Sequence, residues 1–278
     1  MWQSALASSI STSREWLRAV LQSIRASWWA VTKQTYGRIG TAGYATVWVS
    51  YPIFQLSVAG LIYRGARADL LAYAVVGVAA STFVFNAQYY IGQILDEERE
   101  AGTLAGLFLA PCPRLSWLTG FALGGLTDTV VAASLAVVFG ALAFGVRFHP
   151  NYPALALSAL LFLASLWGLG FVFSAIGLVI KKSNDLSNLL SPFLTLLGGI
   201  FYPISLLPIW LQIPAHALPI GYGVQAMASA SLHGAGIEAL APQLIPLTVF
   251  AVVLPWLGIQ TFAWLERGVR ERGELDLY

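Results

Sequence analysis

The chain has 278 residues, of which 58% are hydrophobic and only 10% carry a charged side chain. Soluble domains contain about 25% charged residues because their surfaces must be solvated, so this composition argues against a soluble globular enzyme. The net charge of +2 gives no sign of a nucleic-acid partner. The lipid bilayer is the solvent that the composition fits.

The N-terminal region, residues 1–38, is expected to lie in the cytoplasm and to carry an amphipathic helix. The apolar positions at helical spacing are Trp16, Leu17, Val20, Leu21, Ile24, Trp28 and Val31. Basic residues on the other faces would meet anionic headgroups, which predicts a helix lying in the membrane interface. The alternative is that this helix packs against the protein's own core. No pattern typical of a cleaved signal peptide precedes it.

Six apolar segments follow, each of at least the roughly 20 residues that a transmembrane helix needs. They are residues 41–63, 70–94, 116–146, 153–180, 186–206 and 243–265. The sequence therefore predicts an all-α integral membrane protein, with a six-helix transmembrane domain over residues 39–265. Residues 266–278 are the C-terminal tail.

The segment 206–233, between the fifth and sixth spans, is apolar but interrupted by Pro208, Pro214 and Pro219. Such a segment is too broken for a straight span. Non-helical backbone at membrane depth is tolerated where protein or a wet cavity surrounds it. We expect an external re-entrant hairpin here.

Most basic residues fall on one side of the predicted topology. That side holds 12 of the 15 Lys and Arg residues: Arg14, Arg18, Arg25, Lys33, Arg38, Arg99, Arg114, Lys181, Lys182, Arg267, Arg270 and Arg272. The other side holds Arg64, Arg67 and Arg147. Because basic residues are enriched in cytoplasmic loops, both termini are expected in the cytoplasm of a multi-pass protein of the plasma or inner membrane.

Catalytic motifs are missing from the sequence. There is no phosphate-binding loop and no Gly-Lys pair, which argues against ATP binding by this chain. The three histidines lack metal-ligand spacing, and the single cysteine, Cys112, cannot form an internal disulfide. We therefore expect no enzyme activity, no metal and no cofactor in this chain.

One polar stretch stands between the second and third spans. Five charged residues, Asp96 to Glu100, are followed by Leu104, Leu107 and Phe108 at helical spacing, and Pro111 ends the run. A short helix with acidic groups and apolar side chains can dock into a cleft of a soluble partner. A solvated connecting loop is the alternative, but it does not explain the apolar positions.

Two motifs in this order resemble the permease family of ABC type-2 transporters, the membrane subunits of ABC exporters. The first is Glu97-Glu98-Arg99-Glu100-Ala101-Gly102-Thr103-Leu104, which resembles the family's cytoplasmic coupling segment. The second is Gly198-Gly199-Ile200-Phe201-Tyr202-Pro203-Ile204 with Leu206-Leu207-Pro208 and Trp210-Leu211, which resembles the end of the fifth helix and the external hairpin. The resemblance covers essentially the whole chain.

The resemblance implies that two permease copies, as a homodimer or with a homologue, form the pathway and that separate ATPase subunits bind MgATP. The coupling segment, 96–113, would transmit the ATPase movement. The residues assigned to it are Glu97, Glu98, Arg99, Glu100, Gly102, Thr103 and Leu104. Gly102 would allow a sharp bend, and Thr103 would cap the short helix that follows.

Asp128 stands in the third span, where an ionisable residue is costly and is a functional candidate by default. It is expected to line the substrate path, sense protons or anchor a neighbouring helix. Tyr90 and Phe201 are the aromatic residues expected to face substrate. The external hairpin is assigned Tyr202, Pro203, Pro208 and Trp210.

Ile209 stands where many relatives have an acidic residue before the hairpin tryptophan, which makes the external mouth apolar. The resemblance implies an ATP-driven exporter, and the apolar mouth favours a lipophilic or amphiphilic, drug-like or lipid-like substrate. The alternatives are an exporter of a lipid-linked polysaccharide and an ion-driven secondary transporter.

Overall fold

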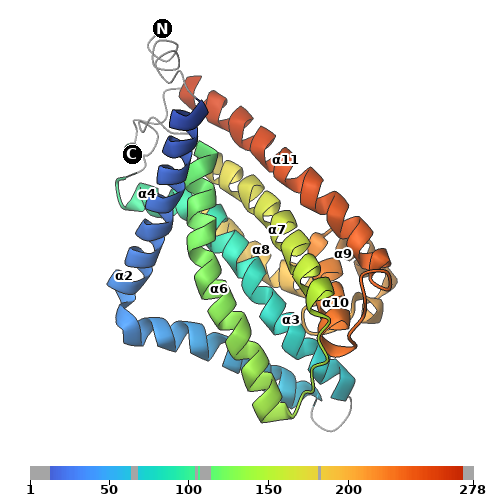
Figure 1. The fold of residues 1–278 in the computed structure, drawn as a ribbon. Helices are drawn as coiled ribbons and strands as arrows, with labels where there is room; N and C mark the ends of the chain where they lie inside the picture. The colour runs from blue at the N-terminus through green and yellow to red at the C-terminus, as the bar shows by residue number, and fades with distance from the viewer. Residues whose placement is uncertain (1–12, 64–67, 104–105, 107–113, 181–182, 272–278) are drawn as a thin grey trace.

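The computed structural model describes residues 13–63, 68–103, 106, 114–180 and 183–271 (Figure 1). Within these ranges every regular element is a helix, as an apolar solvent demands, because a helix satisfies its backbone groups internally. The elements are α2 (Ser13–Tyr63), α3 (Ala68–Asn86), the π-helix η1 (Ala87–Gly92), α4 (Ile94–Glu100), α6 (Arg114–Phe144), α7 (Tyr152–Ile180), α8 (Ser183–Leu197), the 3₁₀ helix η2 (Ile204–Leu206), α9 (Ile209–His216), α10 (Pro219–Leu232) and α11 (Ala241–Glu271).

Among the described residues, four stretches are long and apolar enough to cross a bilayer by length and composition. They are Asp69–Gly92, Ser116–Phe144, Tyr152–Ile176 and Ala241–Leu265, which overlap the predicted second, third, fourth and sixth spans. Two shorter apolar helices, Val49–Tyr63 and Asn188–Leu197, overlap the first and fifth. These helices support an all-α membrane protein, while the count of six spans stays a prediction.

The predicted fifth span, 186–206, is wrong in its second half. Helix α8 ends at Leu197 after 15 residues, which is about 22 Å of helix at about 1.5 Å per residue. The chain turns at Gly198 and Gly199, and Gly199 has a φ of 62° that favours glycine. The hydroxyl of Tyr73 donates a hydrogen bond to the Gly199 carbonyl at 3.2 Å, which holds the turn against α3.

Helix α2 consists of two arms that meet at Gly40, where φ is 67° and ψ is 166°. The first arm packs against α6, and its Ser23 hydroxyl lies 2.9 Å from that of Ser116. Its apolar side chains also face outward, since Leu21 and Trp29 are 63% and 54% exposed. One face of the arm therefore packs against the protein's own core, and apolar side chains on another face point toward the surroundings.

Helices α7 and α11 lie side by side, with small residues where they touch (Figure 1). A Cβ atom at Gly168 of α7 would lie 2.2 Å from the backbone nitrogen of Pro255 in α11. A Cβ at Gly258 of α11 would lie 2.6 Å from the Gly168 carbonyl oxygen. Small residues permit this close approach, which is typical of helix pairs in membranes.

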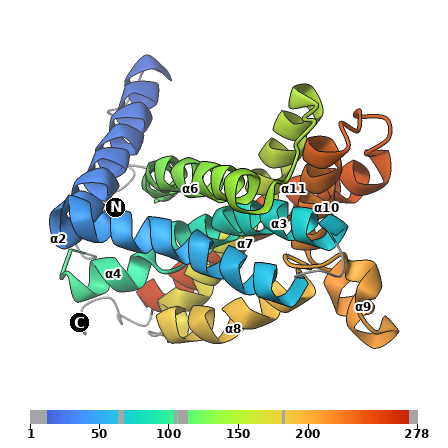
Figure 2. The same cartoon turned by 90° about the horizontal axis from the view of Figure 1, so that it is seen from below.

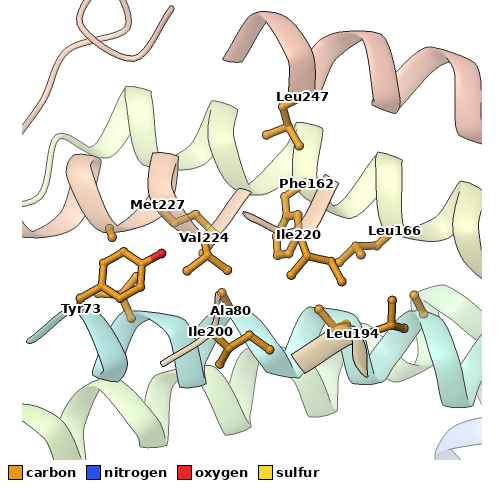
Figure 3. Packing of buried hydrophobic residues seen from close by; sticks show 14 of the residues in the cluster. Tyr73, Ala80, Phe162, Leu166, Leu194, Ile200, Ile220, Val224, Met227 and Leu247 are labelled. Atoms are coloured by element: carbon orange, nitrogen blue, oxygen red, sulfur yellow. The ribbon is translucent and has the colours of Figure 1, made fainter. Parts of the chain in front are cut away.

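Helix α10 supplies the centre of the largest apolar cluster. Its Ile220 and Val224 are fully buried against Phe162 of α7, Ala80 of α3 and Leu247 of α11 (Figure 3). The helical hairpin formed by α9 and α10 is thus tied into the bundle through α10. Whether it re-enters a membrane stays a prediction.

The start of α2, the end of α11 and helix α4 lie at the same end of the bundle (Figure 1). Seen from below, α3 lies between α6 on one side and α8 on the other (Figure 2). The π-helix η1 continues α3 toward α4.

Candidate functional site

Helix α4 is a short helix with a defined end. The amides of Gly102 and Thr103 donate hydrogen bonds to the carbonyls of Arg99 and Glu98, at 3.0 and 2.9 Å. Together with a φ of 70° at Gly102, this is a Schellman motif, in which glycine takes the left-handed position after the helix. Gly102 therefore makes the sharp turn that the sequence predicted at this position.

The charged residues of α4 have different surroundings. Asp96 is buried and accepts a hydrogen bond from Arg99 at 2.9 Å in an ion pair one turn apart. The carboxylate of Glu98 accepts a hydrogen bond from the hydroxyl of Thr103, and Glu97 is half-buried. Glu100 is exposed. Glu100 and the half-buried Glu97 and Glu98 therefore keep accessible surface, whereas Asp96 belongs to the packing.

Thr103 belongs to the end of α4, since its hydroxyl also lies 3.2 Å from the Glu98 carbonyl oxygen. The helix that it was predicted to cap, with Leu104, Leu107 and Phe108, lies outside the described residues.

Asp128 and Tyr90, both predicted to line a substrate path, contact each other. Asp128 lies on α6 and is 4% exposed, and its carboxylate accepts a hydrogen bond from the Tyr90 hydroxyl on η1. The Tyr90 ring covers Gly125, where a Cβ atom would lie 2.1 Å from the ring. This geometry fits the helix-anchoring role among those considered for Asp128.

The π-helix η1 was not predicted, and the sequence carries no marker for it. Its backbone packs closely against α7, because a Cβ atom at Gly170 would lie 2.7 Å from the Ala87 carbonyl oxygen. Just before η1, the Asn86 side chain accepts a hydrogen bond from the Trp167 ring nitrogen at 3.2 Å. π-Helical turns occur frequently at functional sites.

A groove of about 520 Å³ lies beside η1, between α3, α8 and the second arm of α2. Its aromatic residues are Tyr51, Phe85, Tyr89, Phe201 and Tyr202. The rings of Phe85 and Tyr89 are stacked with centroids 3.9 Å apart. Of the three residues predicted to face substrate, Phe201 alone lines this groove.

The polar side chains of the groove are neutral amides and hydroxyls. They come from Gln88, Gln93, Asn188, Ser191 and Thr195. Among the described lining residues none carries a charge. In the sequence, Gln88 and Gln93 near the end of the predicted second span share the ambiguity of Asp128 between packing and function. That they meet Asn188, Ser191 and Thr195 was not predicted, because it depends on how α3 and α8 pack.

Comparison with known proteins then identifies the family. Residues 22–232 match the model of a family described as "ABC-2 type transporter". The chain belongs to this family. No curated protein sequence matches it.

Membership makes the chain the membrane subunit, or permease, of an ABC transporter and implies pairing with ABC ATPase subunits. Permeases of this family are generally non-enzymatic. The match runs from the first arm of α2 to the end of α10, so it includes α4, η1 and the groove. The resemblance found in the two sequence motifs is confirmed.

In the permease's hairpin region, Pro203 and Pro208 precede η2 and α9 in extended conformations that start these helices. The Tyr202 hydroxyl donates a hydrogen bond to the Leu196 carbonyl at 3.0 Å, tying the turn to α8. Trp210 on α9 is 70% exposed. Its side chain is available to a membrane interface, where tryptophan is enriched.

The permease has a second cavity, of about 400 Å³, between η2, α9, α10 and α11. It is lined by Gln212, Gln225 and His233 among others. This cavity lies apart from α4 and η1 and holds none of the predicted site residues except Pro203.

Proposed function

We propose that this permease is the transmembrane subunit of an ATP-driven exporter that moves a lipophilic or amphiphilic small molecule out of the cytoplasm. MgATP would be bound and hydrolysed on separate ATPase subunits. The observation that carries the proposal is the continuity of α4, the coupling element, with η1, whose residues line the groove.

Movement of α4 would change the groove because the two share a backbone turn. The Gln93 carbonyl accepts hydrogen bonds from the amides of Asp96 and Glu97, at 3.0 and 3.2 Å, while the Gln93 side chain lines the groove. A push on α4 from a closing ATPase dimer would therefore act directly on a groove residue. For this push to drive transport, ATP must bind the closed ATPase dimer more tightly than the open one.

Export from the cytoplasm requires α4 to face the ATPase in the cytoplasm. The start of α2 and the end of α11 lie at the same end as α4, which supports cytoplasmic termini (Figure 1). The distribution of Lys and Arg supports the same orientation in the plasma or inner membrane.

A homodimer is the assembly we propose. Helix α8 beside the groove exposes Leu189, Phe193 and Leu196, and the second arm of α2 exposes Phe54. A second copy covering these faces would enclose two grooves in one pathway. Disulfide formation between copies with Phe193→Cys, in a Cys112→Ser background, would support it. Cross-linking only at Val252→Cys, an exposed position on α11, would contradict it.

A lipid-linked polysaccharide is the second candidate substrate, because stacked aromatic rings such as Phe85 and Tyr89 suit sugar faces. The apolar residues at the external end and the modest volume of the groove favour the smaller amphiphile.

The test is to co-express the permease with a candidate ATPase subunit, reconstitute the complex and measure ATP hydrolysis with a substrate panel. Stimulation by lipophilic molecules is expected, and stimulation by glycans alone would favour the second candidate. Charge reversal at Glu98 and Glu100 should reduce ATPase co-purification, with Glu238→Lys, in a predicted external loop, as control. Unchanged assembly and transport would remove α4 from the coupling role.

A further inference from the structure

Two glutamine side chains in the groove are buried without a hydrogen-bond partner for their amide nitrogens. Gln88 and Gln93 are 4% and 2% exposed, and the Nε2 atom of each has no partner. A buried unsatisfied donor costs free energy and calls for an explanation. Both residues line the groove, so a turn of either amide toward a ligand there would give its nitrogen the missing acceptor.

The rest of the lining limits what that ligand can be. The aromatic rings of Tyr51, Phe85 and Tyr89 offer flat apolar surface. The hydroxyl of Thr195 already donates to the Ser191 carbonyl at 2.9 Å, which leaves its oxygen as an acceptor. Because no described lining residue is charged, an ionic group in the groove would have no counter-charge among the residues that line it. Burial of an unpaired charge is costly.

We infer that the groove between α3, η1, α8 and the second arm of α2 binds an uncharged amphiphile, whose carbonyl or ether oxygens accept hydrogen bonds from Gln88 and Gln93. The aromatic rings pack on the ligand's apolar face. The groove volume of about 520 Å³ lies within the range of small-molecule sites, about 300–1,000 Å³. The inference rests on the proposed transport function and narrows its substrate class to neutral molecules.

The test measures binding directly, using the full-length permease with its ATPase subunits in phosphatidylcholine nanodiscs. The probe is a radiolabelled benzophenone with a triethylene glycol chain, which is aromatic, uncharged and rich in acceptor oxygens. A matched probe ends in a quaternary ammonium group. Photolabelling is measured against probe concentration, and the labelled peptides are mapped.

Saturable labelling of peptides that line the groove is expected with the neutral probe. Gln88→Leu and Gln93→Leu should each weaken binding about three- to tenfold, the effect of losing one neutral hydrogen bond. Gln225→Leu, an amide in the second cavity, should leave it unchanged. Gln93 makes no side-chain cap to α4, so its replacement keeps the helix start.

A gain of affinity guards against variants that simply misfold. Gln93→Glu places a carboxylate in the groove and should shift the preference toward the quaternary ammonium probe by about tenfold or more, because the two opposite charges attract at close range. Labelling that does not saturate and spreads over lipid-facing helices would overturn the inference. So would binding that Gln88→Leu, Gln93→Leu and Gln93→Glu all leave unaltered.

Failure of this inference is distinguishable from failure of the proposed function. Loss of groove labelling in a complex that still holds its ATPase and transports overturns only the neutral-ligand site. Groove labelling in a permease that never associates with an ATPase overturns the transport proposal on which it rests.

Discussion

The hydroxyl of Tyr90 on η1 donates a hydrogen bond to the buried carboxylate of Asp128 on α6. This contact joins the π-helix to a neighbouring span, while the next residue back, Tyr89, faces the groove. Tyr90 and Asp128 are therefore positioned to hold η1 against α6.

Removing the Tyr90 hydroxyl should destabilise the permease. We expect Tyr90→Phe to lower the free energy of unfolding by about 1–3 kcal/mol, because the Asp128 carboxylate loses a donor while buried. Thermal unfolding in detergent measures it. Tyr152→Phe, at a tyrosine that is 74% exposed, is the matched control and should be neutral. Loss of transport with unchanged stability would instead indicate a direct role for Tyr90.

Asp128→Asn separates anchoring from proton chemistry. The amide keeps an acceptor oxygen for Tyr90 but cannot titrate, so transport and its pH profile should be nearly unchanged. A flattened pH profile in reconstituted vesicles would contradict the anchoring role and favour proton sensing.

Gly102 should be sensitive to any side chain. Gly102→Ala places a Cβ atom at a φ of 70°, and the strain of roughly 1 kcal/mol should fray the end of α4. We expect weaker ATPase co-purification and lower stimulated ATP hydrolysis. Gly106→Ala is the control. Gly106 does not have a positive φ, and a Cβ atom there would meet nothing within 4 Å. Equal effects of both variants would argue against the role of the turn.

Gly168 should not tolerate enlargement. Gly168→Ala would bring a Cβ atom to 2.2 Å from the backbone nitrogen of Pro255. A backbone atom cannot avoid this clash by a side-chain rotation, so α7 and α11 would have to move apart. The expected loss is about 1–3 kcal/mol, as for overpacked cores. Gly268→Ala, near the end of α11 with nothing within 4 Å, should be neutral in the same unfolding experiment.

The orientation of the chain predicts opposite accessibility for two positions. In a Cys112→Ser background, Arg147→Cys, which lies exposed beyond the end of α6, should react with an impermeant maleimide added outside intact cells. Arg267→Cys, exposed near the end of α11, should react only after the cells are opened. The reverse pattern would place the termini outside.

The sequence by itself determined the class of the protein, the family and the place of α4. Apolar runs are a local property, and a charged stretch such as Asp96 to Glu100 stands out between them whatever its neighbours. The turn at Gly102 was predictable for the same reason, since glycine's conformational freedom is a property of one residue.

Only the tertiary structure decided what those local features contact. The turn that follows α8 is held against the bundle by Tyr73, a residue of α3. The pairing of Asp128 with Tyr90, and the meeting of Gln88 and Gln93 with α8, arise from packing between segments far apart in the chain. Periodicity reports which residues are apolar, but it cannot report which helix faces which, because that depends on the fit of both surfaces.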